Sequence, residues 1–291
     1  MSKPRALITG TSTGIGLATA VHLGNNGFEV FASMRNLAKS SELADAVAKD
    51  NLGVRIVELD VTRPDTICAV VDDILRDGPL DVLVNNAGVG GATPLELVPE
   101  SEHRAIFEAN YFGTIGMIQA VLPHMRERKS GTIVNVTSME GRIAIPNQIP
   151  YSASKWALEC ASEALAHEVY RFGVRVCIIE PGVIMTKIFE NSAPATRYAS
   201  DSPYKQIMRR NGKMFSAGFR IGEPPETVAK VILEAITTDD PKLRYLVGED
   251  AKSFVAGRDK ISDEAWVEMG GDLSDDEYNE RYRSYFGITL E

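Results

Sequence analysis

Short apolar runs and longer amphipathic patterns alternate along the whole chain. Apolar runs rich in β-branched residues occur near 5–10, 28–33, 54–60, 80–88, 131–138, 174–182 and 243–248. Helical periodicity fills the intervals near 14–26, 41–50, 64–77, 101–128, 151–172 and 224–238. Apolar strands that alternate with helices predict crossover units and a parallel sheet covered on both faces. Right-handed crossovers then give a single-domain α/β fold, a Rossmann-like doubly wound parallel sheet of about seven strands.

The alternation predicts a domain that covers residues 1–250, because no linker interrupts it. The stretch 187–222 breaks the rhythm and contains Pro194 and Pro203, so we interpret it as a lid over a substrate site. Residues 251–291 form an acidic C-terminal extension. From Glu249 to the end there are 12 acidic and 5 basic residues, against 40 and 31 in the whole chain.

The net charge of −9 argues against nucleic-acid partners and against binding to anionic lipid. No apolar run approaches the roughly 20 residues that a membrane span needs. The amino-terminal segment has no long apolar core typical of a secretion signal, so we expect a cytoplasmic protein. Cys68, Cys160 and Cys177 are widely spaced and odd in number, which predicts neither a disulfide framework nor a metal site.

A glycine-rich segment, "TGTSTGIG" at 9–16, follows the first predicted strand and opens the first helix. Glycine allows a tight turn and lets the backbone approach a pyrophosphate closely. The helix N-terminus adds free N–H groups and a partial positive charge. The candidate cofactor-binding residues of this segment are Gly10, Ser12, Thr13, Gly14, Ile15 and Gly16.

The end of the second predicted strand, "FASMRN" at 31–36, contains Arg35 and no acidic residue. An acid at this place would bind the 2′-hydroxyl of the NAD ribose, whereas a guanidinium suits the 2′-phosphate of NADP. Ser12 and Ser33 can add hydroxyl donors. The sequence therefore favours NADP(H), with NAD(H) as the alternative if Arg35 is only a surface residue.

The segment "YSASKWALE" at 151–159 contains a tyrosine and a lysine four residues apart, Tyr151 and Lys155. On a helix these side chains lie on the same face. Alone, such a pair is typical of an ordinary surface helix. Its interpretation depends on the motifs around it.

Four motifs stand in a fixed order: "TGTSTGIG", "NNAG" at 85–88, Tyr151-x-x-x-Lys155 and "PGVIMT" at 181–186. Together they resemble the short-chain dehydrogenase/reductase family in its compact, non-extended branch. The resemblance covers about residues 5–248, and the segment after 250 is not part of it. The second strand, the insertion and the C-terminal extension are similar to those of steroid- and retinoid-type members.

The resemblance implies a role for each residue that matches the family pattern. Ser138 would orient the substrate, and Asn110 would hold a water for a proton relay. Tyr151 would be the general acid/base and Lys155 its partner. The remaining cofactor-binding residues implied are Asp60 and Val61 at the adenine, Asn86 and Gly88 in the cleft, and Pro181, Val183 and Thr186 at the nicotinamide end.

The implied reaction interconverts a ketone or aldehyde and an alcohol. A phenol has a pKa near ~10, and lowering it by about 3 units requires about 4 kcal/mol. An exposed ion pair supplies only ~0–1 kcal/mol. We therefore expect Lys155 to act on Tyr151 in a partly desolvated cleft, together with the oxidised nicotinamide. Two alternatives stay open: a catalytically inactive dinucleotide-binding scaffold and an NAD-dependent alcohol dehydrogenase.

The apolar residues after the fifth strand and in the insertion predict a bulky hydrophobic substrate. The alternative is that they pack the lid onto the body. A homodimer or homotetramer is implied by the resemblance alone. The candidate pocket residues are Met139, Ile143, Ile145, Ile149, Met185, Ile188, Phe189, Met208, Met214 and Phe215.

Overall fold

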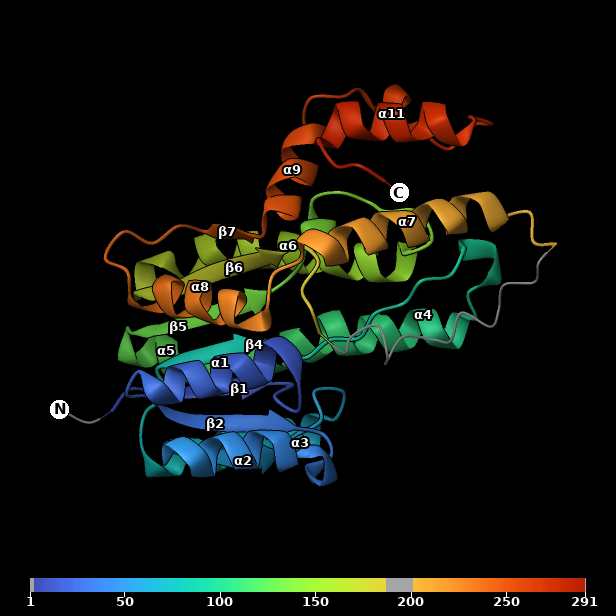
Figure 1. The fold of residues 1–291 in the computed structure, drawn as a ribbon. Helices are drawn as coiled ribbons and strands as arrows, with labels where there is room; N and C mark the ends of the chain where they lie inside the picture. The colour runs from blue at the N-terminus through green and yellow to red at the C-terminus, as the bar shows by residue number, and fades with distance from the viewer. Residues whose placement is uncertain (1–2, 187–200, 291) are drawn as a thin grey trace.

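One parallel sheet of seven strands forms the centre of the computed structural model, which describes residues 3–186 and 201–290 (Figure 1). The strand order is β3-β2-β1-β4-β5-β6-β7. This order reverses between β1 and β4, as the doubly wound prediction requires, so that prediction is confirmed. The strands are β1 (Arg5–Thr9), β2 (Glu29–Met34), β3 (Val54–Glu58), β4 (Val82–Asn85), β5 (Gly131–Val136), β6 (Val174–Pro181) and β7 (Arg244–Val247).

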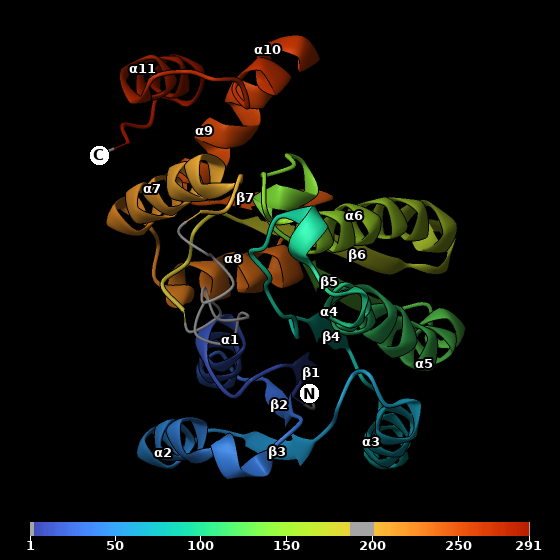
Figure 2. The same cartoon turned by 90° about the vertical axis from the view of Figure 1, so that its right-hand side faces the viewer.

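Helices cover both faces of the sheet (Figure 2). One face carries α1 (Gly14–Asn25), α2 (Ser41–Asp50) and α8 (Pro225–Thr237). The other carries α3 (Pro64–Asp77), α5 (Gly113–Arg128) and α6 (Ile149–Val169). Short 3₁₀ turns occupy η1 (Leu37–Lys39), η2 (Leu95–Leu97), η4 (Met139–Gly141) and η5 (Tyr170–Phe172).

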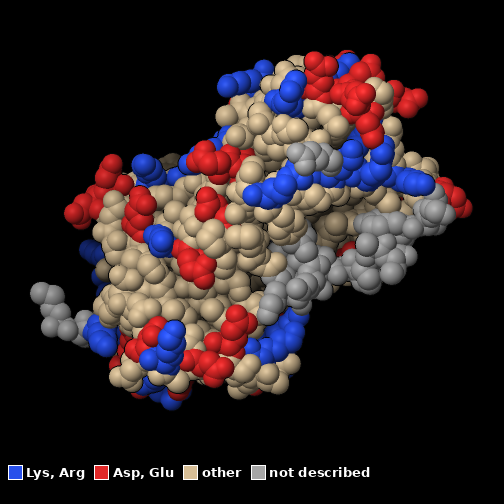
Figure 3. Space-filling model, viewed as in Figure 1, with Lys and Arg blue, Asp and Glu red and all other residues tan. Residues whose placement is uncertain are grey.

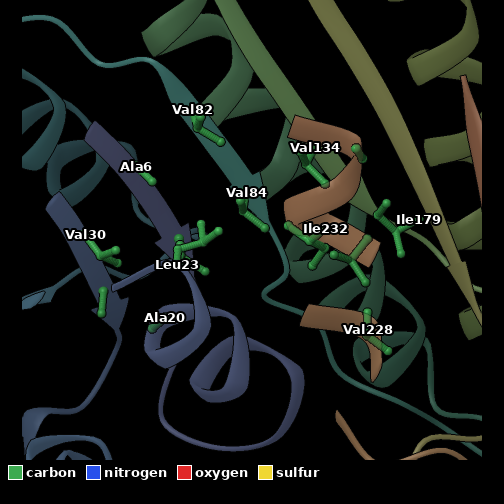
Figure 4. Packing of buried hydrophobic residues seen from close by; sticks show 14 of the residues in the cluster. Ala6, Ala20, Leu23, Val30, Val82, Val84, Val134, Ile179, Val228 and Ile232 are labelled. Atoms are coloured by element: carbon green, nitrogen blue, oxygen red, sulfur yellow. The ribbon is translucent and has the colours of Figure 1, made fainter. Parts of the chain in front are cut away.

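The strands are apolar on both faces because each face meets a helix layer. In β1, Ala6 and Ile8 belong to the cluster under α1 and α8, whereas Leu7 belongs to the cluster on the opposite face. Figure 4 shows Ala6 and Val84 on the side of the sheet that meets Leu23 of α1. The period-2 alternation of side chains therefore builds two separate cores from one strand.

The long helix expected near 101–128 is interrupted in the structure. It is divided into α4 (Glu100–Phe107), a π-helical turn η3 (Glu108–Phe112) and α5. Gly113 lets the helix backbone pass close to Val61, because a Cβ on Gly113 would lie 2.8 Å from a methyl group of Val61. Such π turns are frequent at functional sites, and this one contains Asn110.

Part of the expected lid lies outside the described residues, namely 187–200, which include Ile188 and Phe189. The rest of the stretch contains a helix that the sequence did not predict, α7 (Lys205–Ile221). Among the described residues, no helix is both long enough and apolar enough to cross a membrane.

The C-terminal extension is helical and packs on the body through α9 (Glu249–Arg258), α10 (Asp263–Glu268) and α11 (Asp275–Phe286). In Figure 1, α9 leads away from β7 and α11 lies at the top, beyond α7. The extension packs on the body through a third apolar cluster, whose members come from the extension, α7 and the segment after β5. They include Met139, Ile143, Ile145, Met214, Phe254, Tyr278, Tyr282 and Phe286.

Ion pairs also join the extension to α7. Asp275 pairs with Arg209 at 2.5 Å and with Lys213 at 3.9 Å. Figure 3 shows acidic side chains gathered over the C-terminal helices and basic side chains along α7 below them. The acidity of the extension is therefore partly balanced by the helix on which it lies.

Candidate active site

A cleft of about 410 Å³ opens at the carboxyl ends of the strands, next to the point where the strand order reverses. In an open doubly wound sheet this is the expected position of a ligand site. Most of the predicted site residues line the cleft: Gly10, Ser12, Thr13, Gly14, Ile15, Arg35, Asp60, Val61, Asn86, Gly88, Ser138, Tyr151, Lys155, Pro181, Val183 and Thr186. Among the described residues, Gly16 and Asn110 are the predicted site residues that do not line it.

The glycine turn forms a cradle that fits a pyrophosphate. Gly10 and Gly14 have φ of +72° and +60°, which favours glycine. A Cβ on Gly10 would lie 2.8 Å from the Cα of Ala87. In the described part of the chain, the Thr13 side chain makes no capping hydrogen bond and the first turn of α1 has no acidic residue. The N–H groups of that turn are therefore left for an anion.

Asn86 fixes the turn from behind. Its Nδ2 donates to the carbonyl oxygens of Thr9 at 2.9 Å and Gly10 at 3.1 Å. Thr9 Oγ1 accepts from the backbone N–H groups of Asn86 and Ala87, both at 3.0 Å. Gly16 packs against the same groups, because a Cβ there would lie 2.2 Å from the carbonyl oxygen of Gly10. Asn86 and Gly16 thus fix the shape of the turn.

The end of β2 gives the cleft a cationic margin. Arg35 lines the cleft together with Lys39, which the sequence analysis did not single out. The signal that could have indicated Lys39 is its position four residues after Arg35, as a second basic residue. Ser33, which the sequence offered as a second hydroxyl donor, is buried within the sheet and, among the described residues, does not line the cleft, so the structure gives it no support.

Three candidate catalytic groups meet at the end of β5. Lys155 is 5% exposed, and its Nζ donates to the Val136 carbonyl at 3.0 Å. The same Nζ lies 5.7 Å from the ring centroid of Tyr151. The Ser138 hydroxyl forms a hydrogen bond with Tyr151. Tyr151 of α6 therefore lies beside a serine that follows the end of β5.

Asn110 connects this group to the loop after β4. Its Oδ1 accepts from Val89 N at 2.8 Å, and its Nδ2 donates to Val89 O at 3.0 Å and to Ser154 Oγ at 3.0 Å. A Cβ on Gly88 would lie 3.2 Å from Asn110 Oδ1 and 3.7 Å from Lys155 Nζ. Asn110 therefore holds the 88–89 loop against the lysine.

The pKa of Tyr151 moves in the direction opposite to the one expected from the sequence. Burial raises the pKa of this phenol and the charge of Glu140 adds to the rise, while the hydrogen bond with Ser138 opposes it. Burial also lowers the pKa of Lys155 to about 8. Desolvation disfavours both the phenolate and the ammonium. The protein's own groups therefore keep Tyr151 in its proton-donating form.

Sequence reasoning missed Glu140, a buried acid beside the catalytic group. Its carboxylate accepts from Ser152 Oγ at 2.6 Å, and its backbone N–H donates to Ser138 Oγ at 3.1 Å. Burial raises the pKa of Glu140 to about 8, against an ordinary value of 4.5. A single glutamate after a strand carries no signal of such burial.

Glu140→Gln is expected to change the pH dependence of stability. Because the folded-state pKa lies above the unfolded value, folding takes up a proton between pH 4.5 and 8. The free energy of unfolding therefore falls as the pH rises through this window, and the glutamine variant escapes that loss. Relative to the wild type, it should gain about 1 kcal/mol or more between pH 5 and pH 8.

Denaturant unfolding at the two pH values measures this difference. Glu168→Gln, an exposed change on α6, is the matched control and should follow the wild type. Parallel pH profiles for the wild type and Glu140→Gln would contradict the burial argument.

Comparison with known proteins agrees with this geometry. The family described as short chain dehydrogenase matches residues 4–197. A 3-ketodihydrosphingosine reductase of Bacteroides thetaiotaomicron is 36% identical over 244 residues, which cover 83% of this chain and 87% of that protein. Retinol dehydrogenase 8 of Bos taurus is 34% identical over 252 residues, 82% of this chain and 79% of that protein.

A metagenomic short-chain oxidoreductase solved in complex with NADP is similar in structure. It has a TM-score of 0.68 and 26% sequence identity, and the match covers 85% of this chain and 97% of that one. The chain belongs to the short-chain dehydrogenase/reductase family, whose members are oxidoreductases that use NAD(P) to interconvert CH–OH and C=O groups.

Proposed function

We propose that the protein is an NADP(H)-dependent carbonyl reductase or alcohol dehydrogenase that acts on a hydrophobic substrate, with Tyr151 as the general acid/base. One observation carries this proposal: Ser138, Tyr151 and Lys155 converge in the same cleft that the glycine turn opens. A second class of function, a scaffold that binds a dinucleotide without chemistry, has less support because the chain contains each implied catalytic residue and three of them, Ser138, Tyr151 and Lys155, line one cleft.

The chain's own residues supply binding, orientation and the proton. A nicotinamide dinucleotide, when bound along the cleft, supplies the hydride. Tyr151 donates its proton to the carbonyl oxygen during reduction, and Ser138 donates a hydrogen bond to the same oxygen as negative charge develops there. The raised pKa keeps the phenol protonated before the reaction, but a pKa nearer the working pH gives faster proton transfer, so in this proposal Lys155, together with the nicotinamide as it becomes cationic, lowers that pKa.

Lys155 holds the nicotinamide ribose in this proposal. An ammonium has three N–H donors, and one of them is used by the carbonyl of Val136. The others are available to ribose hydroxyls. Asn110 keeps Gly88 close to the lysine, and we assign to Asn110 the positioning of a water for proton exchange with solvent.

The preference for NADP(H) rests on the cationic end of β2. Arg35 and Lys39 line the cleft, and β2 has no acidic residue near its carboxyl end. A guanidinium binds a phosphate through charge and paired hydrogen bonds. Solved structures of similar fold contain NADP in one case and NAD in another, so the preference rests on Arg35 and Lys39.

Arg35→Ala should raise the KM for NADPH by about tenfold or more and change the KM for NADH by less than about twofold. The reason is that hydrogen bonds to charged groups are worth about 1.5–3 kcal/mol, and only NADPH makes this one. Steady-state kinetics with both cofactors measure the split. Arg55→Ala, an exposed change on β3, is the control. Equal losses with the two cofactors would contradict the assignment.

The apolar substrate class rests on fewer residues than the sequence suggested. Met139 and Phe215 line the cleft. Met139 also belongs to the core that joins the C-terminal extension to the body, and Phe215 packs against that core. Ile143, Ile145 and Met214 belong to the same core and, among the described residues, do not line the cleft, so packing is the favoured explanation for them. The relatives named for 3-ketodihydrosphingosine and retinol support a largely apolar carbonyl or alcohol substrate. A homodimer or homotetramer and a cytoplasmic location stay predictions.

A panel of ketones, aldehydes and alcohols tests the function, with NADPH absorbance as the readout. We expect consumption of NADPH with apolar ketones or aldehydes and slower turnover with small polar ones. If NADPH binds but no carbonyl compound is reduced and no alcohol oxidised, the scaffold function replaces the proposed one.

A further inference from the structure

We propose that Asp250, in the first turn of α9, is a positioning residue for the loop that holds the nicotinamide end of the cofactor. The inference rests on the proposed function and deepens it, because it gives the C-terminal extension a part in cofactor binding. Asp250 lies outside residues 4–197, which the family comparison matches.

The carboxylate of Asp250 holds the backbone of this loop directly. Its Oδ2 accepts from Val183 N at 2.6 Å, and the residue has no exposed surface. Val183 lines the cleft, as do its neighbours Gly182 and Ile184. Val183 and Asp250 are separated by 67 residues in sequence. The hydrogen bond therefore joins the cleft wall to the start of the extension.

Two glycines make room for this carboxylate. A Cβ on Gly182 would lie 2.2 Å from Asp250 Oδ1, and a Cβ on Gly248 would lie 2.5 Å from the same atom. Gly248 also has φ of +103°, a conformation that favours glycine. The loop and the beginning of α9 are therefore built around the side chain of Asp250.

Three backbone hydrogen bonds also hold the loop. Gly182 N donates to Val247 O at 2.9 Å, Glu223 N donates to Val183 O at 3.3 Å, and Met185 N donates to Glu223 O at 3.0 Å. These bonds fix the two flanks of Val183. The carboxylate fixes the N–H between them, so that the loop has one defined path past the cleft.

A purely local role in α9 does not account for Asp250. An acid in the first turn of a helix is favourable, but Glu249 already provides one with its side chain 77% exposed. Asp250 is buried instead, and in the described part of the chain its Oδ1 has no hydrogen-bond partner. Burying a carboxylate oxygen without a partner is unfavourable. The bond from Val183 is the contact that draws this side chain toward the cleft wall, and the backbone N–H groups of Asp250 and Ala251 add local support.

Backbone N–H groups offset part of the cost of burying the Asp250 carboxyl group. Burial raises its pKa and the charge of Glu223 adds to the rise, whereas backbone hydrogen bonds from Val183 and Ala251 oppose it. Loss of the carboxylate would let Val183 shift toward the space that it leaves. Such a shift moves the wall at the nicotinamide end relative to Tyr151 and Lys155.

The test compares Asp250→Ala and Asp250→Asn with Glu249→Gln, an exposed change one residue away. The Kd for NADPH is measured by fluorescence titration without substrate, and KM, kcat and Tm are measured on the same proteins. Asp250→Ala should raise the Kd and the KM for NADPH by about tenfold or more and lower kcat. Asp250→Asn keeps an oxygen acceptor without the charge, so its Kd and KM for NADPH should rise by about two- to fivefold. Glu249→Gln should match the wild type.

A purely structural role would lower Tm but leave the Kd of the folded protein unchanged, and that result overturns the inference. If Asp250→Ala does not fold, Asp250→Asn decides: an asparagine variant with wild-type Kd and kcat also overturns it. A wild-type protein that does not bind NADPH at all contradicts the proposed function instead, so the two failures are distinguishable.

Discussion

Replacing Tyr151 with phenylalanine is expected to lower turnover by at least ~10²-fold while the affinity for NADPH stays within about twofold. The variant loses one hydroxyl, which is the proton donor of the proposed reaction, and general acid catalysis contributes roughly 10²–10⁴-fold. The ring is kept, so the cleft should keep its shape. Steady-state kinetics with saturating NADPH and the best substrate of the panel measure the change.

Tyr170→Phe is the matched control for this variant. Tyr170 lies just beyond the end of α6 and is 83% exposed, so the same chemical change there should leave turnover unaltered. Turnover of Tyr151→Phe within about threefold of the wild type would show that another group supplies the proton.

Gly16→Ala is expected to weaken NADPH binding by about tenfold or more and to destabilise the protein by about 1–3 kcal/mol. A Cβ at this position would lie 2.2 Å from the carbonyl oxygen of Gly10 and 2.5 Å from Asn86 Nδ2. Gly10 belongs to the turn that faces the pyrophosphate, and Asn86 fixes that turn from behind. The added methyl group must therefore move the cradle although Gly16 is not itself part of the cleft wall.

Gly212→Ala provides the control for this prediction. Gly212 lies in α7, and among the described residues nothing lies within 4 Å of a Cβ built on it. Alanine there should be neutral or stabilising because of its higher helix propensity. NADPH titration and thermal unfolding of both variants decide the matter. Unchanged affinity and Tm in Gly16→Ala would contradict the close packing behind the turn.

The sheet was predictable because its signal is local. Each strand is a short apolar run, and apart from the interrupted helix near 101–128 each crossover helix begins and ends within a few residues of the predicted position. The helices of the extension were harder to predict because they pack on distant residues. A readable signal was nevertheless present in α11, where Ser274 and Glu277 form a capping box and Tyr278 and Tyr282 lie four residues apart.

The positions of the site residues were predictable, whereas their environment was not. The family resemblance implied Ser138, Tyr151 and the 181–186 loop, and their places agree with the rule that ligands bind beyond the carboxyl ends of parallel strands. The direction of the Tyr151 pKa depends on tertiary burial and on Glu140, which sequence spacing does not report. The bond from Val183 to Asp250 joins residues 67 apart, and no local pattern indicates it.

A crystal structure of the protein with NADP⁺ tests the central claim most directly. The account predicts the pyrophosphate at the N-terminus of α1 beside Gly14, the 2′-phosphate beside Arg35, and the nicotinamide end beside Tyr151 and Lys155. A dinucleotide bound elsewhere, or one whose nicotinamide end lies away from Tyr151 and Lys155, would contradict it.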